Sequence, residues 1–309
     1  PYPVGRVNCY LLPGTPTTLI DCGVKSERSL TTLDESLHGH SLSIEALDRI
    51  VLTHRHFDHA GAAPELARRS GASLLCHRGS LRDEVKGRQQ FLDLIATFGA
   101  PTSVVEGLES AWTMGDRFGD HLRNASNLIE LKEGSRIESD SGQLEVLETP
   151  GHSPGHLSFV DRERELLFCG DLLLAHITSN PLPHFDDDQP NGRQRSLALY
   201  IRSLEAVEAL GPLRGAPGHG KPIEDTAEAA VKARKHIEKR SNKVLELVRN
   251  NEGKSIFALA TTFFWEDNVL GQSLAFCEIL AHVDLLEERG ILELDQSNGI
   301  PRLFDSATI

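Results

Sequence analysis

The chain is poor in sulfur and in aromatic side chains, with five Cys, one Met, three Tyr and two Trp among its 309 residues. The cysteines are odd in number, widely spaced and never arranged as Cys-x-x-Cys. This usage argues against a disulfide framework and a thiolate zinc site, and it favours a reduced compartment. A run of about 18 apolar residues is absent, and the first residues lack the basic and apolar segments of a signal peptide. We therefore expect a cytoplasmic protein that does not span a membrane.

Positive charge is also scarce, because 32 Lys and Arg oppose 45 Asp and Glu and leave a formal net charge of −13. A field of this sign repels phosphate backbones and acidic membrane surfaces, so we expect a small-molecule substrate rather than a nucleic-acid or membrane partner. The hydrophobic share of 39% and the charged share of 25% are ordinary for globular domains and exclude fibrous and disordered classes. Histidine, by contrast, is abundant, with 14 residues.

Short apolar runs alternate with helical patterns over the first part of the chain. The clearest are strand patterns at residues 49–53, 73–76, 143–149, 156–161 and 165–169 and a helical pattern at 60–70. This alternation predicts an α/β fold in the form of a layered sandwich with helices outside.

A change of pattern between about residues 80 and 134 predicts a helical insertion without strands. Its apolar residues, among them Ile95 and Phe98, follow three- and four-residue steps. The insertion either packs as a cap or forms a lid whose apolar side chains, around Phe91 and Trp112, shape a substrate pocket.

Four metal-competent side chains occur within six residues directly after the expected strand at 49–53. The segment reads His-Arg-His-Phe-Asp-His and spans residues 54–59. Loops that leave the carboxyl ends of strands in α/β folds carry side chains that are free to converge on a ligand. Imidazoles and a carboxylate supply ligands that suit Zn²⁺ without a thiolate. The segment therefore predicts a metal site at this strand end.

Further groups of the same type follow later strands. His152 lies in Pro-Gly-His-Ser-Pro-Gly-His, Asp171 ends Cys-Gly-Asp, and His219 lies in Pro-Gly-His-Gly. Each follows a short apolar run and a glycine, where the backbone can approach its neighbours closely. We expect these side chains to converge with residues 54–59. His156, which begins an expected strand, is assigned a supporting or structural role.

Taken together, these motifs resemble the metallo-β-lactamase superfamily over nearly all of residues 1–222. The resemblance implies a four-layer αββα sandwich, here with the helical insertion, and a metal site at the edge between the two sheets. It implies two Zn²⁺ per chain, with Fe or Mn as alternative metals. The implied ligands are His54, His56 and His152 for one metal, Asp58, His59 and His219 for the other, and Asp171 as the bridge.

In such a centre a metal-bound hydroxide takes the place of a Ser or Cys nucleophile. Two divalent cations that share a water lower its pKa, yield metal-bound hydroxide near neutral pH and polarise the attacked oxygen. Asp58, besides its ligand role, is a candidate catalytic group that orients this water and accepts its proton. His176 and His184, in and after the loop that follows Asp171, are candidates for contact with the substrate.

We expect a catalytic domain at residues 1–225 and a linking helix with a winged-helix-like domain at 226–309. The second part shows a long charged helix at 226–250, two further helices and two strands around an Asn-Gly turn. It resembles the winged-helix domain of the superfamily branch typified by β-lactamase-like protein 2. That branch includes endoribonucleases, and related enzymes release thioester-bound polyketides.

The charge of the expected recognition helix distinguishes between an RNA substrate and a thioester substrate. Residues 273–290 carry four acidic side chains and one Arg, which is the wrong sign for a helix that faces phosphates. We expect its apolar face to pack against the enzyme domain or a second subunit, as in a homodimer. The leading interpretation is a metal-dependent hydrolase of a small-molecule ester, thioester or lactone. The alternatives are a phosphodiesterase or endoribonuclease with the same metals, a β-lactamase, and a nucleic-acid-binding regulator.

Overall fold

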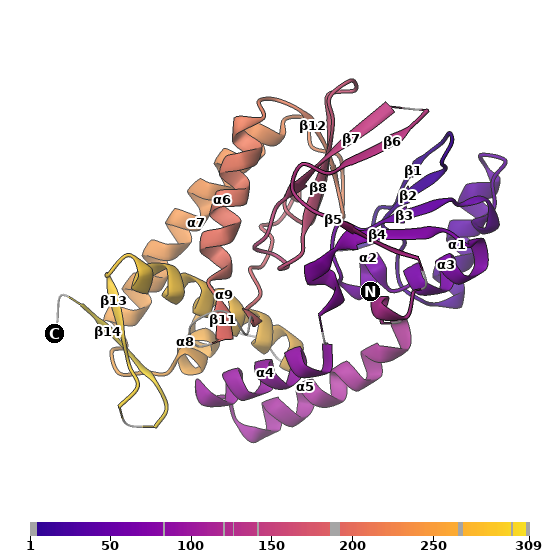
Figure 1. Cartoon of the computed structure of the whole chain (residues 1–309). Helices are drawn as coiled ribbons and strands as arrows, with labels where there is room; N and C mark the ends of the chain where they lie inside the picture. The colour runs from indigo at the N-terminus through magenta and orange to yellow at the C-terminus, as the bar shows by residue number, and fades with distance from the viewer. Residues whose placement is uncertain are drawn as a thin grey trace. The chain divides into compact units, whose positions relative to one another are not determined.

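The computed structural model in Figure 1 describes residues 5–82, 84–119, 121–125, 127–140, 142–185, 192–264, 268–297 and 299–306. The chain divides into two compact units, which are described separately. Unit 1 consists of Pro1–Arg82, Gly115–Ser179 and Ser203–Val231. Unit 2 consists of Asp83–Met114, Asn180–Arg202 and Lys232–Ile309. Residues 83–114 of the predicted insertion thus group with the C-terminal helices, whereas 115–134 belong to unit 1.

Within the described residues, unit 1 is built on two sheets (Figure 1). Sheet A has the order β1 (Tyr10–Leu12), β2 (Thr18–Ile20), β3 (Arg49–Val51), β4 (Ser73–His77) and β5 (Leu128–Leu131). Sheet B has the order β12 (Arg214–Pro217), β9 (Leu166–Gly170), β8 (Leu157–Asp161), β7 (Gly142–Glu148) and β6 (Arg136–Ser139). β2 to β5 run parallel to one another, and so do β9 and β12, while the other neighbouring pairs are antiparallel.

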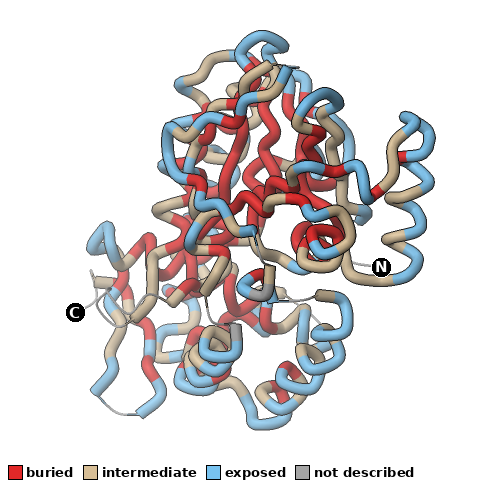
Figure 2. Tube along the Cα trace, turned by 45° about the vertical axis from the view of Figure 1, so that its right-hand side comes forward, coloured by how far each residue is buried: buried red, intermediate tan, exposed pale blue. Residues whose placement is uncertain are grey.

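Alternate residues in the central strands of sheet A face opposite sides, as the two-residue period of a strand requires. The side chains between the sheets include Ile20, Val51, Leu75, Val146, Phe159 and Phe168. The side chains on the other face of sheet A include Leu19, Ile50 and Leu74, which pack with Leu37, Ile44 and Leu66. Figure 2 shows the buried residues concentrated along the strands. Apolar side chains occur on both faces of these strands because both faces are covered.

Helices cover the outer faces of both sheets. Those of unit 1 are α1 (Glu27–His38), η1 (Ile44–Ala46), α2 (Phe57–Ala60), α3 (Ala63–Ser70), η2 (Arg78–Leu81), η3 (Asp116–Phe118) and η4 (Leu122–Asn124), joined by the end of α6 (Ser196–Ala209) and the start of α7 (Thr226–Arg249). In α6, the Ser203 hydroxyl donates to the Pro150 carbonyl at 2.7 Å. In α7, Thr226 packs tightly on Gly215 of β12. A Cβ added to Gly215 would lie 2.9 Å from the methyl group of Thr226. The predicted αββα sandwich is confirmed.

One strand contradicts the prediction that residues 80–134 contain only helices. β5 pairs in parallel with β4, with Leu128 opposite Leu74. In β5, Leu131 is buried but Ile129 is 46% exposed. An edge strand of four residues with one buried side chain gives no clear two-residue period, which is why the pattern missed it.

Unit 2 is a helical core with short strand pairs. Its elements are the start of α6 and most of α7, together with α4 (Glu84–Thr97), α5 (Thr102–Gly115), β10 (His184–Phe185), β11 (Arg193–Gln194), α8 (Ile256–Phe263), α9 (Val269–Glu288), β13 (Leu292–Asp295) and β14 (Arg302–Asp305). Phe276 of α9 lies at the centre, with the rings of Phe91, Phe98 and Phe257 at 6.3, 6.1 and 6.5 Å. The order of helices and hairpin after α7 agrees with the expectation, whereas the winged-helix identity stays a prediction. The Asn298 of the predicted turn lies outside the described residues.

The apolar side chains of the insertion belong to this core. Phe91 and Trp112 lie 5.6 Å apart between ring centres, and both pack against the cluster that contains Phe276. The side chains at three- and four-residue spacing, for which core packing and a pocket were the two predicted roles, are therefore used for helix packing. The lid function stays a prediction.

Among the described residues, α9 is the one helix that is long and apolar enough to cross a membrane by length and composition. Most of its side chains are buried within unit 2, however, which is the pattern of a core helix. Three of its four acidic side chains also form ion pairs with arginines of unit 2. The ion pairs are Asp284 with Arg193, Glu287 with Arg195, and Glu278 with Arg240. The acidic charge predicted to repel phosphates is thus largely neutralised inside unit 2.

Candidate metal centre

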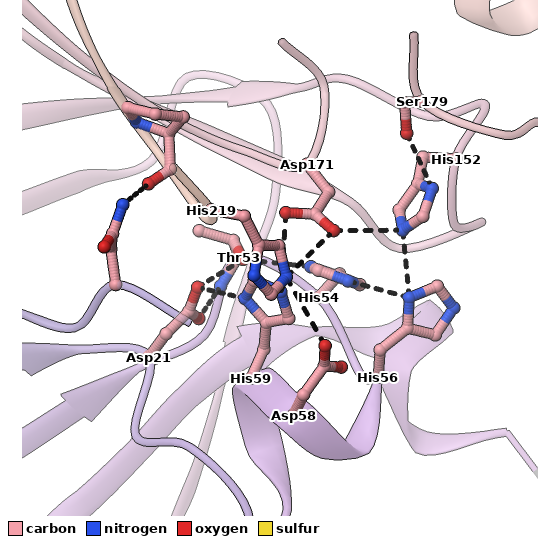
Figure 3. A network of polar contacts seen from close by, with 12 residues as sticks. Asp21, Thr53, His54, His56, Asp58, His59, His152, Asp171, Ser179 and His219 are labelled. Carbon is pink, nitrogen blue, oxygen red and sulfur yellow. Dashed lines mark hydrogen bonds and ion pairs between the residues drawn. The ribbon is translucent and has the colours of Figure 1, made fainter. Parts of the chain in front are cut away.

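Residues that follow four different strands of unit 1 meet at one edge of the two sheets (Figure 3). The segment after β3 runs through Thr53 into α2, for which His56 is the N-cap. His152 lies in the loop after β7, Asp171 directly follows β9, and His219 comes two residues after β12. The seven side chains that the sequence predicted as ligands all lie in this cluster, namely His54, His56, Asp58, His59, His152, Asp171 and His219.

One half of the cluster is made of three imidazoles. His56 Nδ1 lies 2.9 Å from His54 Nε2 and 2.9 Å from His152 Nε2. His54 is fully buried, and His152 is 9% exposed. Three ring nitrogens that face one point match the ligand number of a metal position that keeps room for water or substrate.

The other half joins α2 to the loop after β12. His59 Nε2 lies 3.1 Å from His219 Nε2, and Asp58 Oδ2 lies 3.4 Å from the same His219 atom. His59 and His219 are fully buried, whereas the Asp58 side chain is 19% exposed. This half therefore combines two imidazoles with a carboxylate that water can reach.

Asp171 lies between the two halves. Its Oδ2 is 3.7 Å from His152 Nε2 and 3.6 Å from His219 Nε2, while its Oδ1 is 3.4 Å from His59 Nε2. Within the described part of the chain, Oδ1 is buried and makes no hydrogen bond. A buried carboxylate oxygen without a hydrogen bond is costly unless a cation compensates it, so this position fits a bridging metal ligand.

The imidazoles that point Nε2 into the cluster are all held at Nδ1 by a second group. The pairs are His54 with the Thr53 hydroxyl at 3.0 Å, His59 with the Asp21 carboxylate at 2.8 Å, His152 with the Ser179 hydroxyl at 2.8 Å, and His219 with the Arg6 carbonyl at 3.0 Å. Partners of this kind fix the ring orientation and the tautomer of a metal-binding histidine.

These partners decide where two of the ring protons lie. A carboxylate and a backbone carbonyl only accept hydrogen bonds, so His59 must donate Nδ1–H to Asp21, and His219 must donate Nδ1–H to Arg6. In the neutral rings, the lone pairs of both Nε2 atoms then face each other across 3.1 Å. Two facing lone pairs repel unless a positive charge lies between them. The donor set therefore fits a metal cation, and a proton takes its place when no metal is bound.

The electrostatics of the cluster agree with this assignment. Burial, reinforced by neighbouring histidines, holds the pKa values of His54 and His56 well below the usual range, so both rings are neutral. Burial alone would raise the pKa of Asp58, but the hydrogen bond from His219 and the nearby imidazoles lower it to about 2. Burial alone would lower the pKa of His59, but the nearby carboxylates of Asp171 and Asp21 raise it well above the usual value. Neutral His54 and His56 and ionised Asp58 are thus in the forms that bind metals, whereas the raised pKa of His59 means that a metal must displace a proton from this ring.

Asp21 is a site residue that the sequence reasoning missed. It is 2% exposed, follows β2 and has a φ of 55°. One of its oxygens accepts from the Thr53 amide at 2.9 Å, and the other accepts from the Thr53 hydroxyl at 2.7 Å and from His59. Because Thr53 in turn contacts His54, Asp21 supports one histidine in each half. The strand-end rule that was applied to the predicted ligands would have found it.

We expect Asp21→Asn to weaken metal binding by about 10- to 100-fold, the usual effect of losing such a supporting carboxylate. An amide offers one acceptor atom in place of two, and it cannot stabilise the His59 proton electrostatically. Competition with a fluorescent chelator measures the affinity. The control is Asp161→Asn, because Asp161 is equally buried but lies at the far end of β8, where it pairs with Arg164. Equal metal affinity in both variants would contradict the supporting role of Asp21.

The two predicted substrate contacts belong to different units. His176 is exposed in unit 1 and lies beside the residue after His219, because a Cβ added to Gly220 would come within 2.9 Å of its ring. His184 belongs to β10 of unit 2, where it pairs with Gln194. Contact between either histidine and a substrate stays a prediction.

The fold and the cluster together define an αββα protein with a centre that can hold metal. The family model described as the metallo-beta-lactamase superfamily matches residues 2–219, and the chain belongs to this superfamily. The "Probable metallo-hydrolase YqjP" of Bacillus subtilis is 29% identical, over 93% of this chain and 89% of that protein. A metallo-beta-lactamase family protein from Thermus thermophilus has a similar structure, with a TM-score of 0.80, 26% identity, and coverage of 99% of this chain and 95% of that one.

Two further relatives carry more specific names. The "Hydroxyacylglutathione hydrolase GloC" of Haemophilus influenzae is 28% identical, over 63% of this chain and 77% of that protein. The "Atrochrysone carboxyl ACP thioesterase" of Aspergillus fumigatus is 24% identical, over 79% of this chain and 60% of that protein. Since the relatives are named as hydrolases, the chain is a hydrolase of the metallo-β-lactamase fold.

Proposed function

We propose that this chain uses a two-metal centre, loaded with zinc, to hydrolyse the ester, thioester or lactone bond of a small molecule. The observation that carries the proposal is the position of Asp171 between two groups of three proposed ligands. Its Oδ2 lies 3.7 Å from His152 Nε2 in one group and 3.6 Å from His219 Nε2 in the other, and its Oδ1 faces His59. The names of the two more specific relatives support an acyl substrate, because hydroxyacylglutathione and acyl carrier proteins both hold their acyl groups as thioesters.

Each half of the centre has a separate task in this proposal. His54, His56 and His152 would hold one cation, Asp58, His59 and His219 the other, and Asp171 both. Bound divalent cations supply Lewis acidity, which activates water and polarises the carbonyl group under attack. Asp58 is the more exposed of the two carboxylates, so it is placed to orient the attacking water and to accept its proton.

Exposed apolar side chains lie next to the centre, which supports a substrate whose acyl group lies beside the bond that is cleaved. Phe57 lies between His56 and Asp58 and is 36% exposed. Phe118 is 41% exposed at the end of η3. The following Gly119 approaches α2 so closely that an added Cβ would lie 3.3 Å from the Phe57 Cβ. We propose that these two rings contact the acyl chain.

The polar end of the substrate would lie toward His176. This exposed imidazole lies beside Gly220, next to the proposed ligand His219. A ring nitrogen at this place can donate a hydrogen bond to the leaving group or to a carboxylate of the substrate. We therefore keep His176 as the proposed substrate contact of unit 1.

A substrate panel on a preparation of known metal content tests the proposal. The full chain is analysed for bound metals and then assayed with an acyl thioester, an acyl lactone, a single-stranded RNA and a β-lactam. We expect hydrolysis of the thioester or the lactone, loss of this activity after chelation, and recovery with Zn²⁺. RNA cleavage that requires Asp171, beside inert thioesters and lactones, would overturn the proposal in favour of a nuclease. Tight binding of nucleic acid without turnover would favour a regulator.

A further inference from the structure

His156 is a buried histidine beside the centre that is not one of the seven proposed ligands. It is 1% exposed and lies immediately before β8. Its Nε2 accepts the backbone N–H of Asp171 at 3.1 Å, and its Nδ1 lies 2.8 Å from the Thr149 hydroxyl. The ring therefore connects the loop after β7 to the residue that bridges the two halves of the centre.

The hydrogen bonds fix the protonation of this ring. Since Nε2 accepts from an amide, the ring proton must lie on Nδ1 and be donated to Thr149. The Thr149 hydroxyl can then donate to the Ser158 hydroxyl, 2.9 Å away. Burial, together with nearby histidines, lowers the pKa of His156 to about 3, which keeps the ring neutral and its Nε2 an acceptor.

The backbone at Asp171 needs such an acceptor because of its unusual path. Gly170 has a φ of 47°, in the left-handed region that glycine adopts at little cost. A Cβ at Gly170 would lie 2.8 Å from His156 Nε2 and 2.8 Å from the Thr53 Cβ. His156 and Thr53 thus enclose Gly170 from two sides. The same Thr53 contacts both His54 and Asp21, so the enclosure also involves the partners of two proposed ligands.

From this geometry we infer that His156 is the positioning residue for Asp171: by accepting the amide hydrogen, it sets the direction in which the carboxylate enters the centre. Because Asp171 lies between the two halves, the loss of this hydrogen bond affects both metal positions together. A ligand that belongs to one half would instead weaken one position first. The inference rests on the metal centre of the proposed function but not on its substrate.

The test compares three replacements of His156 that differ in what they offer the amide. His156→Leu removes the acceptor and leaves the Asp171 N–H buried and unpaired. His156→Gln carries an amide oxygen that can reach the place of Nε2, whereas His156→Asn is too short and reaches only the place of Nδ1. The control is His282→Leu, because His282 is also buried and bound to a serine, Ser241, but belongs to unit 2.

Metal affinity and stoichiometry are measured by titrating metal-free full chain with Zn²⁺ against a chelating dye, and melting is followed with and without metal. We expect His156→Leu to weaken both Zn²⁺ equivalents by about 10- to 100-fold, the range for a lost supporting partner, and to lower kcat with little change in KM. His156→Gln should recover most of the affinity, and His156→Asn should not. His282→Leu should lower the melting temperature and leave Zn²⁺ affinity unchanged.

Two results would overturn the inference. One is wild-type Zn²⁺ affinity in a folded His156→Leu chain, and the other is equal affinity in the Gln and Asn variants, which remains informative if the Leu variant does not fold. A wild-type chain that binds two Zn²⁺ but cleaves no ester, thioester or lactone would refute the proposed substrate and leave the positioning role standing. A wild-type chain that binds no metal would overturn both.

Discussion

The Asp171→Asn variant is expected to lose both bound metals and to show kcat/KM reduced by more than about 100-fold, beyond the effect of losing a supporting partner. The physical reason is the position of the carboxylate, which faces His59 with one oxygen and His152 and His219 with the other. An Asn side chain keeps the size of this group but removes its negative charge. It also turns an amide NH₂ toward one of the two halves, where ring nitrogens already converge.

Elemental analysis after dialysis and the thioester or lactone assay measure the two losses. Asp161→Asn again serves as the control, since it changes a carboxylate that is equally buried and paired only with Arg164 at the other end of the sheet. We expect the Asp171→Asn chain to stay folded, because Asn fills the same space and the proton between His59 and His219 keeps the Asp21 and Asp58 carboxylates beside it when the metals are gone. Retention of both metals with wild-type turnover would refute the bridging role.

The predicted ligand set met in space because one rule placed every member. Each ligand comes shortly after a strand whose apolar residues the sequence shows clearly, and the carboxyl ends of these strands meet at one edge of the sandwich. The rule needed neither the order of the strands nor their exact ends. Errors of one or two residues at strand boundaries, as between the predicted 49–53 and the observed β3 (Arg49–Val51), therefore did not change the predicted ligand set.

The supporting contacts were harder to predict because they are made between segments that are distant in the sequence. Asp21 and Thr53 are 32 residues apart, and Ser179 and His152 are 27 residues apart. Nothing in the local pattern distinguishes these polar side chains from others at strand ends and in loops. Asp21 nevertheless follows a buried strand, as the ligands do, so applying the strand-end rule to every Asp would have marked it.

In the insertion, hydrophobic periodicity predicts the helices but not the function of their apolar side chains. Phe91, Phe98 and Trp112 follow a helical spacing, which predicts an apolar face but not its partner. In the structure that partner is the core of unit 2 around Phe276. The exposed Phe57 and Phe118 beside the centre have no periodic signal, because one lies within the ligand segment and the other in a short 3₁₀ helix.

Asp58 differs from Asp171 in a way that separates ligand binding from proton transfer. Its side chain is 19% exposed against 7% for Asp171, and its Oδ2 is 3.4 Å from one ring nitrogen, His219 Nε2. The low pKa of about 2 keeps it ionised at neutral pH, the form that can bind a metal and accept a hydrogen bond from the reacting water. A carboxylate that water can reach, at the border of the centre, is placed to act on the reacting water as well as on a metal.

We therefore expect Asp58→Asn, and more strongly Asp58→Ala, to lower kcat by about 10²- to 10⁴-fold, the usual contribution of a positioned general base, with a much smaller change in KM. The Asn variant keeps an oxygen at the ligand position, so it should retain metal at saturating Zn²⁺ while losing the proton acceptor. Steady-state kinetics with metal content measured on the same samples separates the two roles. If turnover at full metal occupancy equals that of the wild type, Asp58 has no part in proton transfer. If excess Zn²⁺ restores the lost turnover completely, Asp58 acts as a ligand alone, because a missing base cannot be replaced by added metal.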